Sequence, residues 1–201
     1  MPTTYNFLIE DIKEVKTDVL IFWTSSSLLA GDEKFVEIHN TAGSSLRTEV
    51  YNVKYDYKLE NFKFGENIMT NAGILYVDKL IHCVSPNYRI QTDNKNKLSL
   101  LARTLYNIKS KIAAFEELNY RVLNVAFLPL SEKIYGPVTD KDLKFFLENI
   151  YTNFSNFHEI TFIFSNKQEQ MRYKRIFKKI NKPRLKKIKA YARYFKPNFK
   201  I

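Results

Sequence analysis

The chain has 201 residues, of which 45% are hydrophobic and 15% aromatic. This composition can bury a full domain core and excludes a largely disordered chain. A single cysteine, Cys83, excludes an internal disulfide and favours a reducing compartment. No apolar run approaches the roughly 20 residues that a membrane span needs, and no signal-peptide core begins the chain. We therefore expect an intracellular (cytoplasmic) or virion-internal protein that is not secreted and does not contact a membrane.

The net charge of +11 is unevenly distributed along the chain. Residues 167–201 hold 14 Lys or Arg and one acid, a net charge of +13, whereas residues 1–166 hold 18 basic and 20 acidic residues, a net charge of −2. A nearly neutral body followed by a strongly cationic end predicts a body and an arm with different partners.

Short apolar runs predict six strands, near residues 5–9, 19–23, 67–70, 80–84, 122–127 and 160–164. Helical patterns lie between them, so the expected fold is α/β, a three-layer α/β/α sandwich around a mixed central sheet. We expect this domain to span residues 1–181, with a basic, aromatic C-terminal arm at 182–201. Pro183 marks the boundary because proline does not continue a helix.

Four helices are predicted in chain order. The first, 35–41, ends at Gly43, and the second, 98–118, has apolar residues at alternating steps of three and four. A capping-box pattern, TDKD at 139–142, predicts the start of the third. The fourth, 167–180, is expected to bury Met171, Ile176, Phe177 and Ile180.

Residues 19–43, VLIFWTSSSLLAGDEKFVEIHNTAG, join a strand of buried type to a helix through a serine-rich turn. In α/β sheets, ligands bind beyond the carboxyl ends of such strands. The segment resembles the macro domain family, the ADP-ribose-binding modules, whose pattern is an apolar strand, N-A-A-N-S-S-L, a glycine run and I-H-x-A-A-G. SSLL at 26–29 and IHNTAG at 38–43 match this pattern without a gap.

Three further stretches resemble the same family. EDI at 10–12 is similar to the family's G-D-I, and KLIHCVSP at 79–86 is similar to the strand Y-V-I-H-x-V-G-P. LPLSEKIYG at 128–136 resembles the second phosphate loop, F-P-A-I-S-T-G-I-Y-G, shortened by one residue. Because the motifs keep their order from about residue 5 to 180, they favour the macro fold, while saying less about activity.

The resemblance implies a site in which backbone N–H groups of two glycine-rich loops hold a pyrophosphate. The first loop of this chain has Asp32 and Glu33 beside its one remaining glycine, and the second has Glu132 and Lys133 where the family has Thr and Gly. The carboxylates would repel a pyrophosphate, whereas Lys133 offers a cation. The alternative is that both loops are surface turns. The ligand positions implied by the resemblance are Asp11, Ser25, Gly31, Ser131, Lys133, Ile134, Tyr135 and Gly136.

Two of these positions have an equally simple structural explanation. Asp11 matches the family aspartate that hydrogen-bonds the adenine, but it also fits a capping carboxylate in an acidic patch with Glu10 and Glu14. Tyr135 matches an aromatic near the distal ribose, although an aromatic at a loop mouth is more often a packing residue.

Hydrolytic chemistry is not expected. The hydrolase branch of the family uses an asparagine and an acid to position water at the ribose, and these positions fall on Ser25 and Phe35. Neither side chain acts as a general base near neutral pH. We therefore expect no catalytic residue and a non-enzymatic protein.

The histidines do not indicate a metal centre. His39 and His82 lie on apolar elements and are expected in the core, while His158 is alone in a loop. Their spacing and that of the single cysteine do not match a metal-ligand pattern, so neither a metal nor a cofactor is expected.

The arm interleaves basic residues with aromatic ones, which suits phosphate contacts and base stacking, or docking on an acidic protein surface. A solvated segment without a partner is the remaining alternative. We expect the chain to be a degenerate macro-like module that serves as a structural or interaction component of a larger assembly, such as a virion or a nucleoprotein. The alternative functions are an ADP-ribose reader and an ADP-ribosyl hydrolase. The residues expected to contact an anionic partner are Arg184, Lys186, Lys187, Lys189, Arg193 and Lys196.

Overall fold

The computed structural model describes residues 2–58, 60–85, 94–119 and 123–181. The strands are β1 (Thr4–Ile9), β2 (Thr17–Thr24), β3 (Asn67–Asn71), β4 (Val77–Val84), β5 (Asn124–Phe127) and β6 (Glu159–Phe164). The helices are α1 (Glu33–Ala42), α2 (Ser44–Tyr57), α3 (Asn94–Asn119), α4 (Glu132–Tyr135), α5 (Asp140–Asn153) and α6 (Lys167–Ile180). The predicted arm, with all six of its candidate contact residues, lies outside the described residues.

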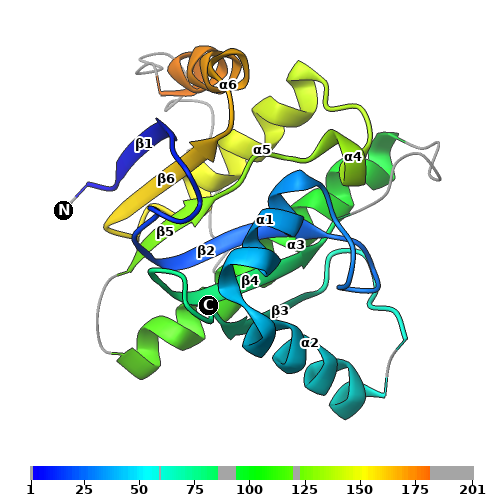
Figure 1. Cartoon of the computed structure of the whole chain (residues 1–201). Coiled ribbons are helices and arrows are strands. Elements are labelled where there is room, and N and C mark those ends of the chain that lie inside the picture. Colours follow the sequence, from blue (N-terminus) through cyan, green and yellow to red (C-terminus); the bar gives the residue numbers. More distant parts are fainter. Residues whose placement is uncertain (1, 59, 86–93, 120–122, 182–201) are drawn as a thin grey trace, which may run out of the picture.

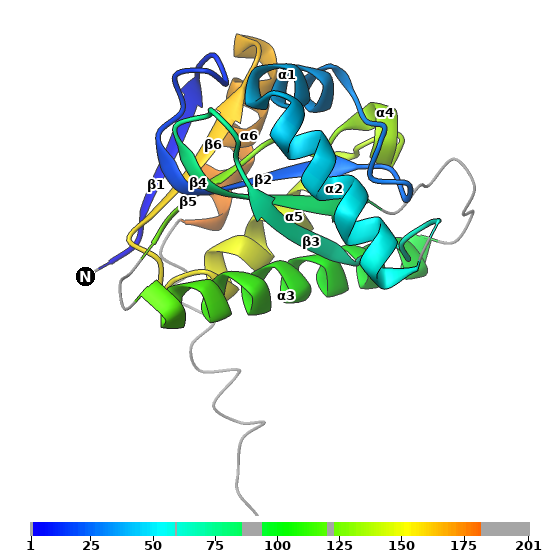
Figure 2. The same cartoon turned by 60° about the horizontal axis from the view of Figure 1, so that its bottom comes forward.

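The strands form one sheet in the order β1-β6-β5-β2-β4-β3. Neighbouring strands are parallel except β3, which runs antiparallel to β4. Helices α1 and α2 cover one face of the sheet, and α3, α5 and α6 cover the other (Figures 1 and 2). The predicted three-layer sandwich with a mixed sheet is thus confirmed.

Side-chain alternation along the central strand divides the interior into two cores. Val19, Ile21 and Trp23 of β2 join the core under α3, α5 and α6. Leu20 and Phe22, between them, join the core under α1 and α2. Because both faces of β2 are buried, neither face needs polar side chains, which explains why VLIFW is continuously apolar.

Helix α5 begins where its capping box predicts. The Thr139 side chain accepts from the Asp142 backbone N–H, and the Asp142 carboxylate accepts from the Thr139 N–H. Asp142 also accepts from the Lys97 ammonium at 2.9 Å, and both side chains of this ion pair are less than 10% exposed. The start of α5 is therefore tied to α3.

One prediction for α6 is wrong. Met171 was expected on the buried face, but it is 58% exposed, and Tyr173 is buried in its place. Tyr173, Ile176 and Phe177 are spaced by three and four residues and share one face, whereas a residue two positions from Tyr173 points away from it. The Tyr173 hydroxyl accepts from the Leu130 N–H at 2.9 Å, so α6 also supports the end of β5.

The apolar pattern does not predict α2. Gly43, at φ +87°, ends α1 as expected, and α2 follows it at once. Only Leu46 and Val50 of α2 are buried, while Tyr51, Tyr55 and Tyr57 are exposed. Such a narrow apolar stripe gives a weak helical signal, and packing on the sheet decides the conformation.

Candidate functional site

A cleft of about 500 Å³ lies beyond the carboxyl ends of β2, β5 and β6. In the sheet, the neighbour of β2 on one side is β4, which follows it in the chain. On the other side lies β5, whose next neighbour is β6. The direction in which strands are added therefore reverses between β2 and β5. A crevice opens at such a switch point, where α/β proteins bind ligands. The cleft is lined by the segment before and at the start of α1, by the β5–α4 loop and by the start of α6, together with Trp23.

The first loop, residues 24–31, is held together by its own hydrogen bonds. The Ser25 N–H donates to the Ala30 carbonyl at 2.8 Å, and the Thr24 hydroxyl donates to the same oxygen at 3.0 Å. The hydroxyls of Ser25 and Ser27 lie 2.8 Å apart. Leu28 is buried in the left-handed conformation, at φ +60°. The loop therefore forms a closed turn, and the carbonyls of Ser26 and Ser27 accept from the Phe62 N–H and the Lys54 ammonium outside it.

Gly31 permits close packing against Phe35. A Cβ atom on Gly31 would lie 2.3 Å from the Phe35 Cβ, a separation that side-chain atoms do not tolerate. Phe35 is buried, and its ring centroid lies 4.1 Å from that of His39. Phe35, four residues after Gly31, thus belongs to the core under α1.

Two long helices begin at the cleft. Asp32 caps α1 by accepting from the Phe35 N–H at 3.0 Å, and Asn166 caps α6 by accepting from the Glu169 N–H at 2.9 Å. The first N–H groups of a helix have no partner within the helix, and they carry partial positive charge. Both helix starts therefore favour an anionic group in the cleft.

The second loop contains a short helix. The N–H groups of Ile134 and Tyr135 donate to the Ser131 carbonyl, and the Gly136 N–H donates to the Glu132 carbonyl. Gly136 has φ +84°, a conformation that glycine adopts without strain. These three amides point into α4, which turns the loop away from the open cradle that the family motif implies.

Carboxylates and cations are interleaved along the cleft wall. The carboxylates are Asp32, Glu33, Glu132 and Glu169, and the cations are Lys34, Lys133 and Arg172. Lys133 lies 3.5 Å from Glu33, and Arg172 lies 3.8 Å from Glu132 and 2.9 Å from Asp140. Burial raises the pKa of the Glu169 carboxyl, and the carboxylates of Glu132 and Asp32 raise it further. The described wall is thus nearly balanced in charge.

The structure places the predicted ligand residues apart. Ser131 and Lys133 line the cleft, whereas Ser25 and Gly31 lie in the closed first loop behind it. Ile134 is partly buried and Gly136 is buried, and Tyr135 lies wholly in the core, with the Lys97 ammonium 4.7 Å from its ring centroid.

Asp11 is exposed and lies outside the cleft wall. Its carboxylate accepts from the Lys13 N–H at 3.0 Å, and this bond lowers the pKa of Asp11. Asp11 thus forms a local turn with its own chain, as the capping alternative anticipates.

Among the cleft residues that were missed from the sequence, besides Lys34, are Asn166, Glu169 and Arg172. They follow β6, the strand beside β5, and a strand-end rule applied to the run 160–164 points to them. The last family motif quoted from the sequence ends at residue 136, before this segment.

His39 and His82 are core residues, as predicted. Burial lowers the pKa of His39 to about 4, and the neighbouring Arg47 adds to the effect. Burial lowers the pKa of His82 to about 3, and its Nε2 pairs with the Thr70 hydroxyl at 2.9 Å. Cys83 is buried, which raises the pKa of its thiol. Among the described residues, His, Cys, Asp and Glu do not gather in a group of three suited to a metal, and the described helices do not include one long and apolar enough to cross a membrane.

Comparison with known proteins decides the family. The family model described as "Macro domain" matches residues 24–141, more than half of the chain. The chain belongs to the macro domain family. An O-acetyl-ADP-ribose deacetylase of Cronobacter turicensis is 31% identical over 131 residues, covering 65% of this chain and 69% of that protein. A macro domain-containing protein of Caldanaerobacter subterraneus is 24% identical over 174 residues, covering 86% of this chain and 94% of the relative.

Solved macro domain structures share the fold. The Oceanobacillus iheyensis macrodomain with ADP has a TM-score of 0.73 at 21% identity, covering 87% of this chain and 90% of that one. The Trypanosoma brucei macrodomain in complex with ADP has a TM-score of 0.66 at 15% identity, covering 86% of this chain and 68% of that one. At such identities the likeness shows the macro fold alone.

Proposed function

We propose that this macro domain binds a nucleotide of the ADP-ribose class in the cleft without hydrolysing it. The observation that carries the proposal is the position of the cleft, at the switch point between β2 and β5, with the starts of α1 and α6 at its wall. Relatives named O-acetyl-ADP-ribose deacetylases and solved macrodomains with ADP support this choice of ligand.

The residues of the cleft have defined roles in this proposal. Lys34, Lys133 and Arg172 and the two helix starts attract the phosphates. Glu33 and Glu132 oppose them, but the side chains of these two glutamates are 89% and 66% exposed, so solvent screens much of their repulsion. A weak site for a pyrophosphate follows from this near balance.

Two residues support the absence of hydrolysis. At the family's asparagine position, the Ser25 hydroxyl is engaged with Ser27. At the family's acid position, Phe35 is buried against Phe22 and His39 and has no proton to exchange.

Isothermal titration with ADP-ribose tests the cleft. We expect measurable binding that strengthens about 3- to 10-fold in the Glu33→Gln, Glu132→Gln double variant, because two like charges are removed from the phosphate path. Glu117→Gln changes an exposed glutamate on α3 and serves as the control. If wild type and double variant both give no heat and no NMR shift at millimolar ADP-ribose, the proposal fails.

Turnover is tested separately on O-acetyl-ADP-ribose, the substrate in the relatives' names. We expect no release of acetate above the rate without protein. Release of acetate above that rate would make the non-hydrolytic part of the proposal wrong, and release that survives Ser25→Ala would show that residues other than Ser25 catalyse the reaction.

A second candidate is a non-enzymatic interaction module of a larger assembly, such as a virion or a nucleoprotein. The observation that favours it is the pairing of Lys133 and Arg172 with carboxylates of the protein itself, which leaves less positive charge for a phosphate. The basic arm at 182–201 would supply the contact with an acidic protein surface or with nucleic acid. Removal of residues 182–201 tests this role: unchanged association with the assembly would exclude the arm as the contact.

A further inference from the structure

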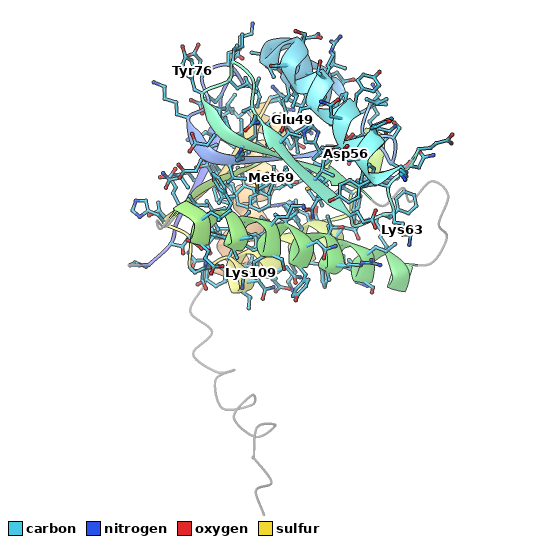
Figure 3. The ribbon with its side chains drawn as sticks, turned by 90° about the horizontal axis from the view of Figure 1, so that it is seen from below. Glu49, Asp56, Lys63, Met69, Tyr76 and Lys109 are labelled. Carbon is cyan, nitrogen blue, oxygen red and sulfur yellow. The ribbon has the colours of Figure 1, made fainter. Side chains whose placement is uncertain are left out.

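The outer edge of β3 lies open between α2 and α3, with Met69 at its centre (Figure 3). The opposite edge of the sheet is covered, because α6 packs on β1 and the Gln170 side chain donates to the Phe7 carbonyl at 2.7 Å. The β3 sequence, NIMTN, has no proline or lysine to discourage the pairing of another strand.

The ladder with β4 determines which groups of β3 point outward. In an antiparallel pair, alternate residues bond to the partner strand. The Val84 N–H donates to the Glu66 carbonyl, so residues of the same parity as 66 face β4. Asn67, Met69 and Asn71 therefore turn their backbone groups outward, and the Asn71 N–H indeed donates to the Glu49 carboxylate at 3.1 Å. In the part of the chain that the structure describes, the outward backbone groups of Asn67 and Met69 have no such cap.

A pocket of about 330 Å³ adjoins this edge. Its walls include Phe62, two residues of β3 and the α3 residues Asn107, Ser110 and Lys111. Asn67 is directly opposite Cys83, whose side chain lies in the core under α3, so the Asn67 side chain is on the same face as the pocket.

The Asn67 carboxamide is buried without a hydrogen-bond partner among the described residues. The residue is 8% exposed, and neither its Nδ2 nor its Oδ1 has a hydrogen-bond partner among the described residues. A buried carboxamide without partners destabilises a fold, so a group that enters from the pocket and supplies both a donor and an acceptor would stabilise it.

Charge differs across the groove beside β3. Glu49 and Asp56 lie on the α2 side (Figure 3), whereas the pocket wall on the α3 side holds Lys111 together with Glu66. An added strand would point alternate side chains toward α2 and toward α3. The groove therefore suits a strand whose α2-facing residues are basic and one of whose α3-facing residues carries a carboxamide.

We propose that the β3 edge binds an extended peptide segment of a partner protein by strand addition, with an Asn or Gln side chain of that segment entering the pocket to pair with Asn67. The peptide backbone pairs with the outward N–H and carbonyl groups of Asn67 and Met69. Main-chain pairing gives affinity and the pocket gives selectivity, as in other strand-addition complexes. This site is separate from the nucleotide cleft and does not depend on it.

A phage-displayed random heptapeptide library, selected on the immobilised full chain, tests the proposal. We expect enriched sequences that carry basic residues at alternate positions and share one Asn or Gln. A synthetic peptide of the enriched sequence should bind wild type and lose at least tenfold in affinity with Met69→Pro, which removes an outward N–H without removing a ladder bond. Met171→Ala, at an exposed methionine of α6, should leave binding unchanged.

Asn67→Leu separates a ligand role from a structural one. If the carboxamide serves a ligand, this variant loses the preference for Asn or Gln while its thermal midpoint stays equal or rises by about 2–4 °C. A midpoint lowered by several degrees would show that the carboxamide supports the fold, and the pocket assignment would be wrong.

Other outcomes would also overturn the proposal. These are a library without enrichment, and enriched peptides that bind Met69→Pro as tightly as wild type. A wild-type dimer that Met69→Pro splits in sedimentation analysis would identify a second copy of this chain as the occupant. If circular dichroism shows Met69→Pro to be unfolded, Asn67→Leu alone decides.

Discussion

Single residues decide how far the first loop departs from an open phosphate cradle. Gly31 packs directly against Phe35, which leaves no room for a side chain at position 31. Phe35 in turn is buried because α1 covers the core under α1 and α2. The glycine thus serves packing, whatever ligand the loop contacts. A sequence motif records the glycine but not the neighbour that requires it.

Replacing Gly31 should therefore destabilise the domain. We expect Gly31→Ala to lower the free energy of unfolding by about 1–3 kcal/mol, because the new methyl group overlaps Phe35. Urea denaturation measures the loss. In a Phe35→Gly background, which removes both the Phe35 Cβ and its ring, the same change should have a smaller effect, and an equal effect in both backgrounds would contradict the packing explanation.

The two buried histidines should make stability depend on pH. Their folded-state pKa values, about 4 for His39 and about 3 for His82, lie below the unfolded value of about 6.5. The unfolded chain therefore binds more protons, so stability is present above pH 6.5 and is lost as the pH falls toward 4, by about 1.4 kcal/mol per pH unit for each histidine.

Urea midpoints between pH 4 and 7 check this expectation. The difference between wild type and His39→Gln isolates the share of His39 from that of carboxylates, which titrate at the lower end of the window. Equal slopes for the two proteins would mean that His39 is accessible to protons in the folded state.

At the scale of elements, the buried ion pair between Lys97 and Asp142 joins α3 to the first turn of α5. Burial opposes ionisation of Asp142, but the bonds from Lys97 and Thr139 outweigh it and leave the pKa lowered. The Lys97 ammonium also donates to the Pro137 carbonyl at 3.0 Å. The same lysine thus fixes both the cap of α5 and the segment before it.

Lys97→Met should cost about 3–5 kcal/mol in the free energy of unfolding, because it leaves the Asp142 carboxylate buried with fewer partners. Lys144→Met is the matched control, since the pair of Lys144 with Glu148 is 3.7 Å long and solvent-exposed. Its loss should cost less than about 1 kcal/mol. Similar effects of the two changes on urea midpoints would argue against the buried connection.

At the scale of the whole molecule, a domain at residues 1–181 with 24 basic and 21 acidic residues, a net charge of +3, is followed by an arm with a net charge of +8. The proposed boundary near residue 181 predicts that residues 1–181 fold alone, because the described residues up to Phe177 already form both cores, with Ile180 packed against one of them. We expect a protein ending at residue 181 to keep the thermal midpoint within about 2 °C, checked by calorimetry. A midpoint lowered by 5 °C or more would place part of the arm in the fold.

The sequence alone determined the α/β class, the six strands and the family. A continuous apolar run such as VLIFW is typical of a strand whose two faces are both buried. Such a strand can therefore be recognised from its own residues. The capping box of α5 and the stop of α1 at Gly43 are equally local. Short-range sterics and hydrogen bonding fix these features.

Only the tertiary structure decided the composition of the cleft and the fate of the motif residues. It placed Tyr135 in the core and Asp11 in a surface turn, and it brought Glu169 and Arg172 to the cleft. It also turned Tyr173 inward instead of Met171, formed α2 from a weakly patterned segment, and left Asn67 buried beside an open edge. These outcomes depend on which strand ends become neighbours and on what each side chain meets there, and such contacts join residues that are distant in the sequence.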